Sequence, residues 1–456
     1  MMIRKKSGWK PVESKELRQK VRQIVLELAS LLKNPQEVVK KVTAQENNLT
    51  AAGFSIFPWS ALSLSNGFPS IALFYGELDR LFPNDGWDEV GFEYLQWVQK
   101  AFIEEEIENL SLWSGICGVL MAVRSLSREG TRYQNMMKQL HDVYLSDYPM
   151  LLDTTLSELH EGARAEYYDV VDGWSGIGRY LLFNKHDPQL TKSLKEILIY
   201  LVQLCEDKEI NQQLLPGWFI PDKHHMSIAG ESMYPYGLFN LGLAHGIPGP
   251  LALLSIALLQ GVEVPRQREA IMKITEWLIQ WKQEDEYGLY WPFWISEEDY
   301  QKGRLKEVQT RAAWCYGTPG ISRALLLAGR ALDDSRYQQI ASDSFLSVFR
   351  RPEQEWKTNS PTFCHGYIGL LQMTQRMLAD TNNKELFRYR DYLLEKVLDF
   401  YDHQAPLRFY EMVMIKTKSN KVTNAGLLSG VAGIGLTLLS LISDQEPEWD
   451  SVFLIN

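Results

Sequence analysis

The stretch YGTPGISR, from Tyr316 to Arg323, decides the fold because seven variants of it run along the chain. Each variant centres on a glycine and opens a short apolar segment. The first glycines are Gly67, Gly115, Gly176, Gly246, Gly317, Gly366 and Gly430. Glycine permits a sharp turn, and proline at the third position, as in Pro319, suits the first turn of a helix. The pattern therefore predicts seven turns, each followed by a buried helix, with loops of unequal length between them.

A longer amphipathic segment precedes each glycine element. In the fourth segment Leu194, Ile197 and Leu201 recur at helical spacing on one face. The seven segments are 14–33, 88–104, 133–148, 191–207, 267–283, 335–351 and 384–403. Alternation of half-exposed and fully buried helices predicts an all-α fold, an α/α toroid with seven outer and seven inner helices. We expect one such domain over residues 1–456, with loop insertions at about 208–240 and 284–310.

The composition narrows the class of protein. The 456 residues are 45% hydrophobic and 23% charged, which is typical of globular proteins. A formal net charge of -10 argues against a general nucleic-acid binder, because phosphate contacts need clustered Lys and Arg. The basic N-terminus lacks the apolar stretch of a signal peptide, and no apolar run reaches the roughly 20 residues that span a bilayer. We therefore expect a cytoplasmic protein whose four cysteines are reduced.

Alignment of the seven turns on their first glycine singles out two cysteines and two histidines. Cys315 and Cys364 stand two residues before the glycine in consecutive copies, and His245 and His365 stand one residue before it. Two thiolates and an imidazole make a good zinc set, and three protein ligands leave the fourth tetrahedral position open, as in catalytic sites. The alternative is a pair of buried cysteines beside a hydrogen-bonded histidine. The remaining cysteines, which fit core packing, are Cys117 and Cys205.

Several motifs then occur in the same order as in a known family. They are YDVVDGWSG (168–176), PGWFIP (216–221), AHGIPG (244–249), WCYGTPG (314–320), CHG (364–366) and SGVAGIG (429–435). Through these motifs, over roughly residues 60 to 440, the chain resembles the LanC lanthionine synthetases, or lanthipeptide cyclases. The resemblance implies an α/α toroid, one zinc ion held by Cys315, Cys364 and His365, and the cyclisation of a dehydrated peptide.

The reaction that the resemblance implies adds a peptide cysteine thiolate to dehydroalanine or dehydrobutyrine, giving a (methyl)lanthionine thioether ring. The addition forms an enolate, which needs charge stabilisation and then a proton. His245 is the expected acid, with Asp169 as its partner and Asp172 as the competing partner. Arg311 matches a family arginine that could stabilise the enolate or hold Asp169. Tyr316 follows the first cysteine and could hydrogen-bond the substrate or only pack.

The resemblance also implies partners. The substrate would be a dehydrated lanthipeptide precursor, leader plus core, and a separate dehydratase and a peptide transporter would complete a biosynthetic complex that could hold the protein peripherally at a membrane. The alternative is a LanC-like adaptor that binds glutathione or another thiol without cyclase activity. A zinc-dependent prenyltransferase is disfavoured because those enzymes use a carboxylate-containing zinc set. A glycosidase is disfavoured because it would depend on paired carboxylates.

Overall fold

The computed structural model describes residues 8–51, 54–105, 107, 109–210, 212–224, 234–306, 308–415 and 418–456. These residues form 17 α-helices, six short 3-10 helices and ten short strands, and the strands pair only as five two-stranded sheets. The expectation of an all-α protein is confirmed. None of the described helices combines the length and the apolar character that a membrane crossing requires.

A helix follows each glycine turn, and we call these seven the turn helices. They are α3 (Phe68–Leu81), α5 (Ile116–Leu126), α8 (Trp174–Leu181), α10 (Pro248–Leu259), α13 (Thr318–Ala331), α15 (Tyr367–Thr381) and α17 (Val431–Ile442). The last of them is buried from Val431 to Leu441. Such burial is the condition under which a helix that is apolar on all sides is stable. Pro248 and Pro319 lie in the first turns of α10 and α13, as expected.

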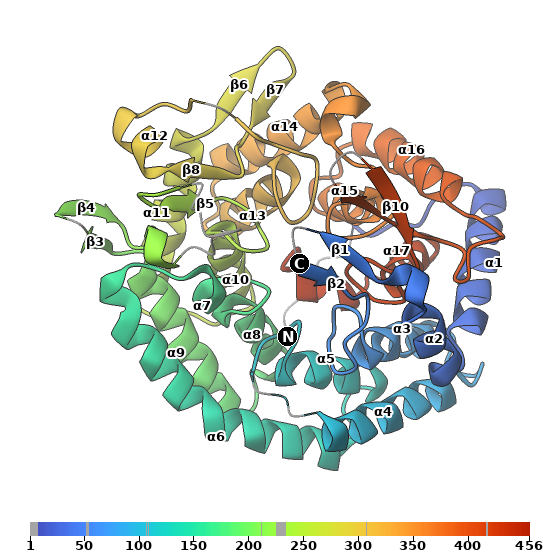
Figure 1. Ribbon diagram of the computed structural model, residues 1–456. Helices are drawn as coiled ribbons and strands as arrows, with labels where there is room; N and C mark the ends of the chain where they lie inside the picture. Colours follow the sequence, from blue (N-terminus) through green and yellow to red (C-terminus); the bar gives the residue numbers. More distant parts are fainter. Residues whose placement is uncertain are drawn as a thin grey trace. The chain divides into compact units, whose positions relative to one another are not determined.

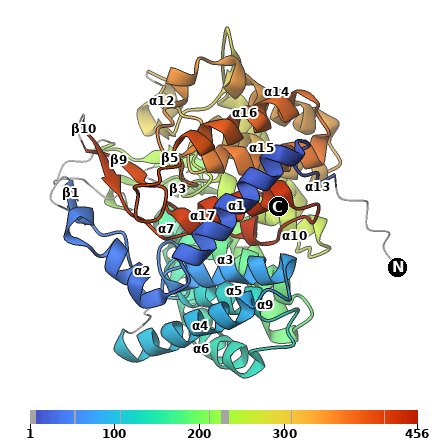
Figure 2. The same ribbon diagram turned by 90° about the vertical axis from the view of Figure 1, so that its right-hand side faces the viewer.

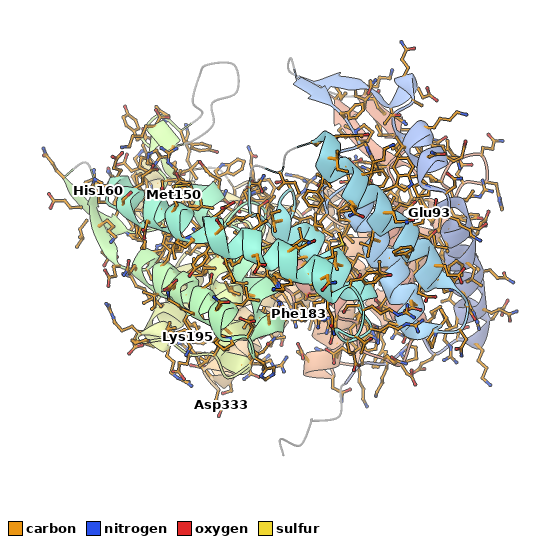
Figure 3. The ribbon with its side chains drawn as sticks, turned by 90° about the horizontal axis from the view of Figure 1, so that it is seen from below. Glu93, Met150, His160, Phe183, Lys195 and Asp333 are labelled. Atoms are coloured by element: carbon orange, nitrogen blue, oxygen red, sulfur yellow. The ribbon has the colours of Figure 1, made fainter. Side chains whose placement is uncertain are left out.

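The seven expected amphipathic helices are also present. They are α1 (Lys15–Leu31), α4 (Trp87–Glu104), α6 (Gln134–Glu158), α9 (Pro188–Leu204), α11 (Gln267–Gln280), α14 (Ser335–Arg350) and α16 (Glu385–Asp399). The first turn of α9 is capped by Asp187, whose carboxylate accepts the backbone N–H groups of Gln189 and Leu190. Figure 3 shows the exposed side chains of Met150 on α6 and Lys195 on α9.

One boundary among these helices was predicted wrongly. Helix α6 does not end at residue 148 but continues through Pro149 to Glu158. Proline usually ends a helix because it lacks an N–H. Here the turn before the proline is anchored on α9, where the Tyr148 hydroxyl donates to the Glu196 carboxylate (3.1 Å). Side-chain packing has therefore overridden the local signal.

Internal contacts divide the chain into two compact units, which we describe separately. Unit 1 comprises residues 1–109, 113–141 and 358–450, and unit 2 comprises 110–112, 142–357 and 451–456. In unit 1, α17 packs against α3, α15 and α1 (Figure 2), so the last turn helix is a neighbour of the first. In unit 2, α10 packs against both α8 and α13 (Figure 1). The expectation of one domain stays a prediction.

Short hairpins occupy the segments that were expected to be insertions. In unit 2 these segments form β3 (Asp207–Ile210) with β4 (Gln213–Pro216), β6 (Gln283–Asp285) with β7 (Gly288–Tyr290), β5 (Leu238–Asn240) with β8 (Trp294–Ser296), and the short helix α12 (Glu297–Lys302). The β5–β8 pair joins the two segments to each other, with Asn240 opposite Trp294. In unit 1, β1 (Leu49–Ala51) pairs with β2 (Phe54–Ile56) and β9 (Glu411–Ile415) with β10 (Lys418–Val422), both antiparallel.

Within each unit, backbone hydrogen bonds join one glycine turn to the next. In unit 2 the N–H of Val170 donates to the carbonyl of Ala244 (3.0 Å), and the N–H of Ala244 donates to the carbonyl of Cys315 (3.2 Å). In unit 1 the corresponding bonds, each written from N–H donor to carbonyl acceptor, are Cys364 to Leu428 (3.0 Å), Leu428 to Ser65 (3.1 Å) and Leu64 to Trp113 (2.8 Å). We call these the turn-to-turn hydrogen bonds. They use donors and acceptors two or three residues before the glycine. Consecutive turns are therefore held at a fixed distance by main-chain groups.

The close spacing of the turns explains the two glycines of the motif. Gly317, which caps α13, has a φ of +97°, and a Cβ there would lie 1.9 Å from the carbonyl oxygen of Arg311. At Gly320 a Cβ would lie 2.9 Å from the Cβ of Leu243, in the neighbouring turn. The first glycine is thus needed for the backbone conformation, and the fourth for the approach of the next turn.

The third turn lies three residues earlier than expected. Helix α8 begins at Trp174 with Gly173 as its N-cap, so Gly173 is the first glycine of this turn and Gly176 is the fourth. A Cβ at Gly176 would lie 2.2 Å from the carbonyl oxygen of Val170, six residues earlier. The fourth glycine of the fifth turn has the same contact, because a Cβ at Gly320 would lie 2.5 Å from a carbonyl six residues before it.

This correction changes which residues stand before the third glycine. Asp172, and not Ser175, occupies the position that His245 and His365 hold in their turns. Gly173 and Gly176 are three residues apart, so both satisfy the sequence pattern. Only the backbone contacts distinguish them.

A buried ion pair fastens α15 to the segment that follows α17 in unit 1. The Arg376 guanidinium donates to both carboxylate oxygens of Asp450, at 2.7 and 2.6 Å, and to the carbonyl of Pro447. The Gln372 side chain donates to the same carboxylate at 2.7 Å. Arg376 and Asp450 are both buried, and the guanidinium also pairs with the half-exposed Glu446 carboxylate.

We predict that Asp450→Asn lowers the free energy of unfolding by about 1.5–3 kcal/mol, because the buried Arg376 loses its two charged hydrogen bonds to Asp450 and keeps only Glu446 as an ion-pair partner. Urea denaturation followed by circular dichroism measures the change. Asp444→Asn, at an exposed position of the same segment, is the control and should change stability by less than about 0.5 kcal/mol. Equal stabilities of the two variants would contradict the prediction.

Candidate active site

In unit 2, a buried aspartate receives three hydrogen bonds at the third turn. Asp169 follows the short helix α7 (Ala165–Tyr168), and its Oδ1 accepts the backbone N–H groups of Asp172 (2.7 Å) and Gly173 (2.8 Å). Its Oδ2 accepts a hydrogen bond from Nδ1 of His245 at 2.6 Å. The side chain of Asp169 is 1% exposed, so these bonds replace the water that a carboxylate needs.

His245 faces outward from this aspartate. Its turn is joined to the third turn because the N–H of Val170 donates to the carbonyl of Ala244. The His245 side chain is 40% exposed, so part of the ring is accessible while Nδ1 is fixed. Asp169 is therefore its partner, whereas Asp172 is exposed and contributes a backbone N–H to Asp169.

The surroundings of His245 favour its protonated form. Burial by itself would lower its pKa, but the hydrogen bond from His245 to Asp169 and the charges of Asp169, Asp172 and Cys315 outweigh this effect. The pKa of His245 is therefore raised above its ordinary value. A histidine in this state can act as a general acid near neutral pH.

Cys315 and Tyr316 belong to the next turn of unit 2. The Ala244 N–H donates to the carbonyl of Cys315, which brings this cysteine next to the His245 turn, as expected from the repeat. Tyr316 is half-buried, and its hydroxyl accepts a hydrogen bond from Nδ2 of Asn240 at 3.1 Å. The Tyr316 ring also packs edge-on against Phe293, at 5.3 Å between centroids.

Arg311 lies in the same turn but does not hold the aspartate. Its guanidinium donates to the backbone carbonyl of Lys357 at 3.2 Å. The carboxylate of Asp169 is already occupied by His245 and two backbone N–H groups. The second role considered for Arg311, stabilisation of the enolate, stays a prediction.

In unit 1, the turn before α15 carries Cys364 and His365. The N–H groups of Phe363 and Cys364 both donate to the carbonyl of Leu428, at 3.1 and 3.0 Å. These bonds fix the backbone of the turn. The side chains of Cys364 and His365 are only partly buried, although the flanking Phe363 and Gly366 are fully buried. Both side chains are therefore partly exposed to solvent.

The other two thiols differ from those at the turns. Cys117 is buried within α5, and Cys205 is buried at the end of α9, where its thiol donates to the carbonyl of Leu201. Burial raises the pKa of Cys205 to about 12 and that of Cys117 further. Neither forms a thiolate readily at neutral pH, which agrees with the packing roles expected from the sequence.

Sequence reasoning missed two polar residues of these sites. Asn240, at the end of β5, bonds both the Tyr316 hydroxyl and the N–H of Gly242. Glu411, at the start of β9 in unit 1, interacts electrostatically with His365. Burial raises the pKa of Glu411, while hydrogen bonds from Asn424 and Ser429 and the His365 charge oppose this rise. Neither residue belongs to a glycine motif, so the repeat gave no signal for them.

We predict that the pKa of His245 lies above the usual value of about 6.5 and falls in Asp169→Asn. Burial lowers this pKa, and the variant removes the negative charge that opposes burial most strongly. Nuclear magnetic resonance of the histidine ring, followed as a function of pH, measures both midpoints. Asp172→Asn is the control and should lower the midpoint less, because this residue contributes charge without a side-chain hydrogen bond. An unchanged midpoint in Asp169→Asn would refute the assignment.

Comparison with known proteins relates these features to a family. A family model described as "Lanthionine synthetase C-like protein" matches residues 58–454. The nisin biosynthesis protein NisC of Lactococcus lactis subsp. lactis is 27% identical over 389 residues, which are 83% of this chain and 89% of that protein. A solved structure named nisin cyclase matches with a TM-score of 0.75 at 23% identity and covers 97% of this chain and 98% of that chain. The shared fold confirms the expected α/α toroid, and the chain belongs to the lanthionine synthetase C-like protein family.

Proposed function

We propose that this protein is a zinc-dependent lanthipeptide cyclase. It would add cysteine thiolates of a peptide to dehydroalanine or dehydrobutyrine and form (methyl)lanthionine thioether rings. The observation that carries the proposal is the Asp169–His245 pair beside the Cys315 turn, in a chain of this family. The names of the relatives support it, because they describe nisin biosynthesis and a nisin cyclase.

The proposed ligands of one zinc ion are Cys315, Cys364 and His365. Among the described residues, the side chains of Cys, His, Asp and Glu supply one candidate metal group, and these three are its members. Two sulfur ligands and one nitrogen ligand suit zinc, and a three-residue set leaves a position for the substrate. Zinc, when bound, deprotonates a thiol that coordinates it, so that the peptide cysteine is available as its thiolate at neutral pH.

His245 would supply the proton that completes the addition. Attack of sulfur on the β-carbon of the dehydro residue forms a carbon–sulfur bond and shifts the π electrons into an enolate. Asp169 holds Nδ1 of His245 and keeps the ring charged, so the accessible part of the ring can protonate the α-carbon. The neutral ring then regains its proton from solvent.

Tyr316 and Arg311 would orient the substrate. Asn240 fixes the Tyr316 hydroxyl, which could hydrogen-bond a peptide carbonyl next to the reacting carbon. The Arg311 guanidinium, which donates to the Lys357 carbonyl, would stabilise the enolate oxygen by its charge.

The chemistry also defines partners and location. The substrate, a precursor of leader plus core peptide, must first be dehydrated at serine and threonine, so we propose a separate dehydratase and a peptide transporter as partners. We place the reaction in the cytoplasm, where peptide thiols stay reduced. Association with a membrane would then occur through the complex.

We predict that the purified protein contains one zinc ion and removes free thiols from a dehydrated precursor, and that Cys315→Ala loses both properties, since two ligands alone bind zinc weakly. Metal analysis and a thiol-loss assay on candidate precursors measure the two properties. Cys205→Ala is the control, because this buried cysteine lies outside the proposed site. Glutathione binding without thiol loss would instead favour the adaptor function, and full activity without zinc would exclude the proposal.

We predict that His245→Asn lowers the cyclisation rate by about 10²- to 10⁴-fold while zinc content stays the same, because a general acid is removed and no ligand is lost. His186→Asn, an exposed histidine of unit 2, is the control. The wild-type rate should fall as the pH rises through the raised pKa of His245, because the acid then loses its proton. Asp169→Asn should move this fall to lower pH, and a pH profile identical to wild type would exclude the role of the pair.

A further inference from the structure

Glu411 is a carboxylate of unit 1 to which the reaction described above assigns no role. It is the first residue of β9, and its Oε2 accepts a hydrogen bond from Nδ2 of Asn424 at 2.9 Å. The hydroxyl of Ser429 donates a second hydrogen bond to the carboxylate. Asn424 is itself fixed, because its Oδ1 accepts the N–H of Gly426 at 2.8 Å. The carboxylate is therefore held in one orientation by neutral groups.

Backbone bonds bring this carboxylate to the turn of His365. The residue after Glu411, Met412, donates its N–H to the hydroxyl of Ser360 at 3.1 Å. The carbonyl of Ser360 accepts the N–H of Tyr367 at 2.9 Å, which closes the turn that contains His365. Glu411 is thus tied to the His365 turn through one strand residue.

Leu428 and Ser429 form a second connection between Glu411 and the His365 turn. The carbonyl of Leu428 accepts the N–H of Cys364 at 3.0 Å. The next residue is Ser429, which bonds Glu411 and holds the same position before its glycine as His365 holds in the preceding turn. The carboxylate consequently lies between two consecutive turns, close enough to His365 for their charges to interact.

A purely structural role explains this arrangement poorly. Burial disfavours the charged form of Glu411, and among the described residues no Lys or Arg acts on its carboxylate. A glutamine would satisfy Asn424 and Ser429 without that cost. The imidazole of His365 interacts electrostatically with this carboxylate.

We propose that Glu411 is a positioning residue that accepts a hydrogen bond from the imidazole of His365 and fixes the ring for metal binding. Metal-binding histidines generally donate their second ring N–H to a carboxylate or a carbonyl, which sets the tautomer and makes the other nitrogen a better ligand. The inference rests on the proposed function, because it requires His365 to be a zinc ligand.

The test is the dissociation constant for zinc, measured on the full chain by competition with a chromophoric chelator. Glu411→Gln should bind zinc about 10- to 100-fold more weakly than wild type. Glu411→Asp, which keeps the charge on a shorter side chain, should lose less affinity. Glu395→Gln, at an exposed position of α16 in the same unit, is the matched control and should bind as wild type does. The melting temperature of each metal-free variant separates weaker binding from misfolding.

Two further measurements make the outcome decisive. Ser429→Ala removes one support of the carboxylate and should weaken zinc binding several-fold even if Glu411→Gln fails to fold. In cobalt-substituted protein, Glu411→Gln should shift the d–d absorption bands, because the histidine donor changes. Wild-type affinity and an unchanged cobalt spectrum in these variants would overturn the role of Glu411 while the proposed function stands. A wild-type protein without zinc affinity would overturn both.

Discussion

The site depends on hydrogen bonds between main-chain groups of consecutive glycine turns. The carbonyl of Ala244 accepts from Val170 and its N–H donates to Cys315, and the carbonyl of Leu428 likewise accepts from Cys364 while its N–H donates to Ser65. Such bonds require a close approach of the turns, which a side chain on Gly320, the fourth glycine of the fifth turn, would prevent. They keep their geometry whatever side chains the turns carry. The turns can therefore vary in sequence, and chemistry can be placed on them without changing the fold.

The position immediately before the first glycine of a turn carries the candidate site histidines. Histidines hold this position in one turn of each unit, His245 in unit 2 and His365 in unit 1, and each has a carboxylate nearby. The two carboxylates are held differently. Asp169 accepts two backbone N–H groups, donors that suit a charged carboxylate, whereas the partly buried Glu411 accepts neutral side-chain donors. The first arrangement suits a histidine that must carry a proton, and the second suits one that must keep a fixed ring.

The cysteines show the same effect of position on chemistry. Cys205, on the buried face of a helix end, has a strongly raised pKa and bonds a helix carbonyl. Cys364 lies in a turn whose backbone is already satisfied by Leu428, and its side chain is partly accessible. Burial thus makes one thiol inert, whereas the turn leaves the other partly exposed, as the proposed role as a metal ligand requires.

The sequence by itself predicted seven glycine turns and the alternation of buried and amphipathic helices, and it singled out Cys315, Cys364, His365 and His245 as candidate site residues. Glycine spacing and helical periodicity are local properties, so they can be read along the chain. The tertiary structure decided three things that depend on contacts distant in sequence. It shows that the third turn starts at Gly173 and not at Gly176, which the sequence could not distinguish because both fit a pattern of glycines three residues apart. It shows that Asp169, and not Asp172, is the hydrogen-bond partner of His245, which depends on a contact distant in sequence. It also brought Glu411 to His365 through a hairpin outside the repeat, where no periodic signal exists.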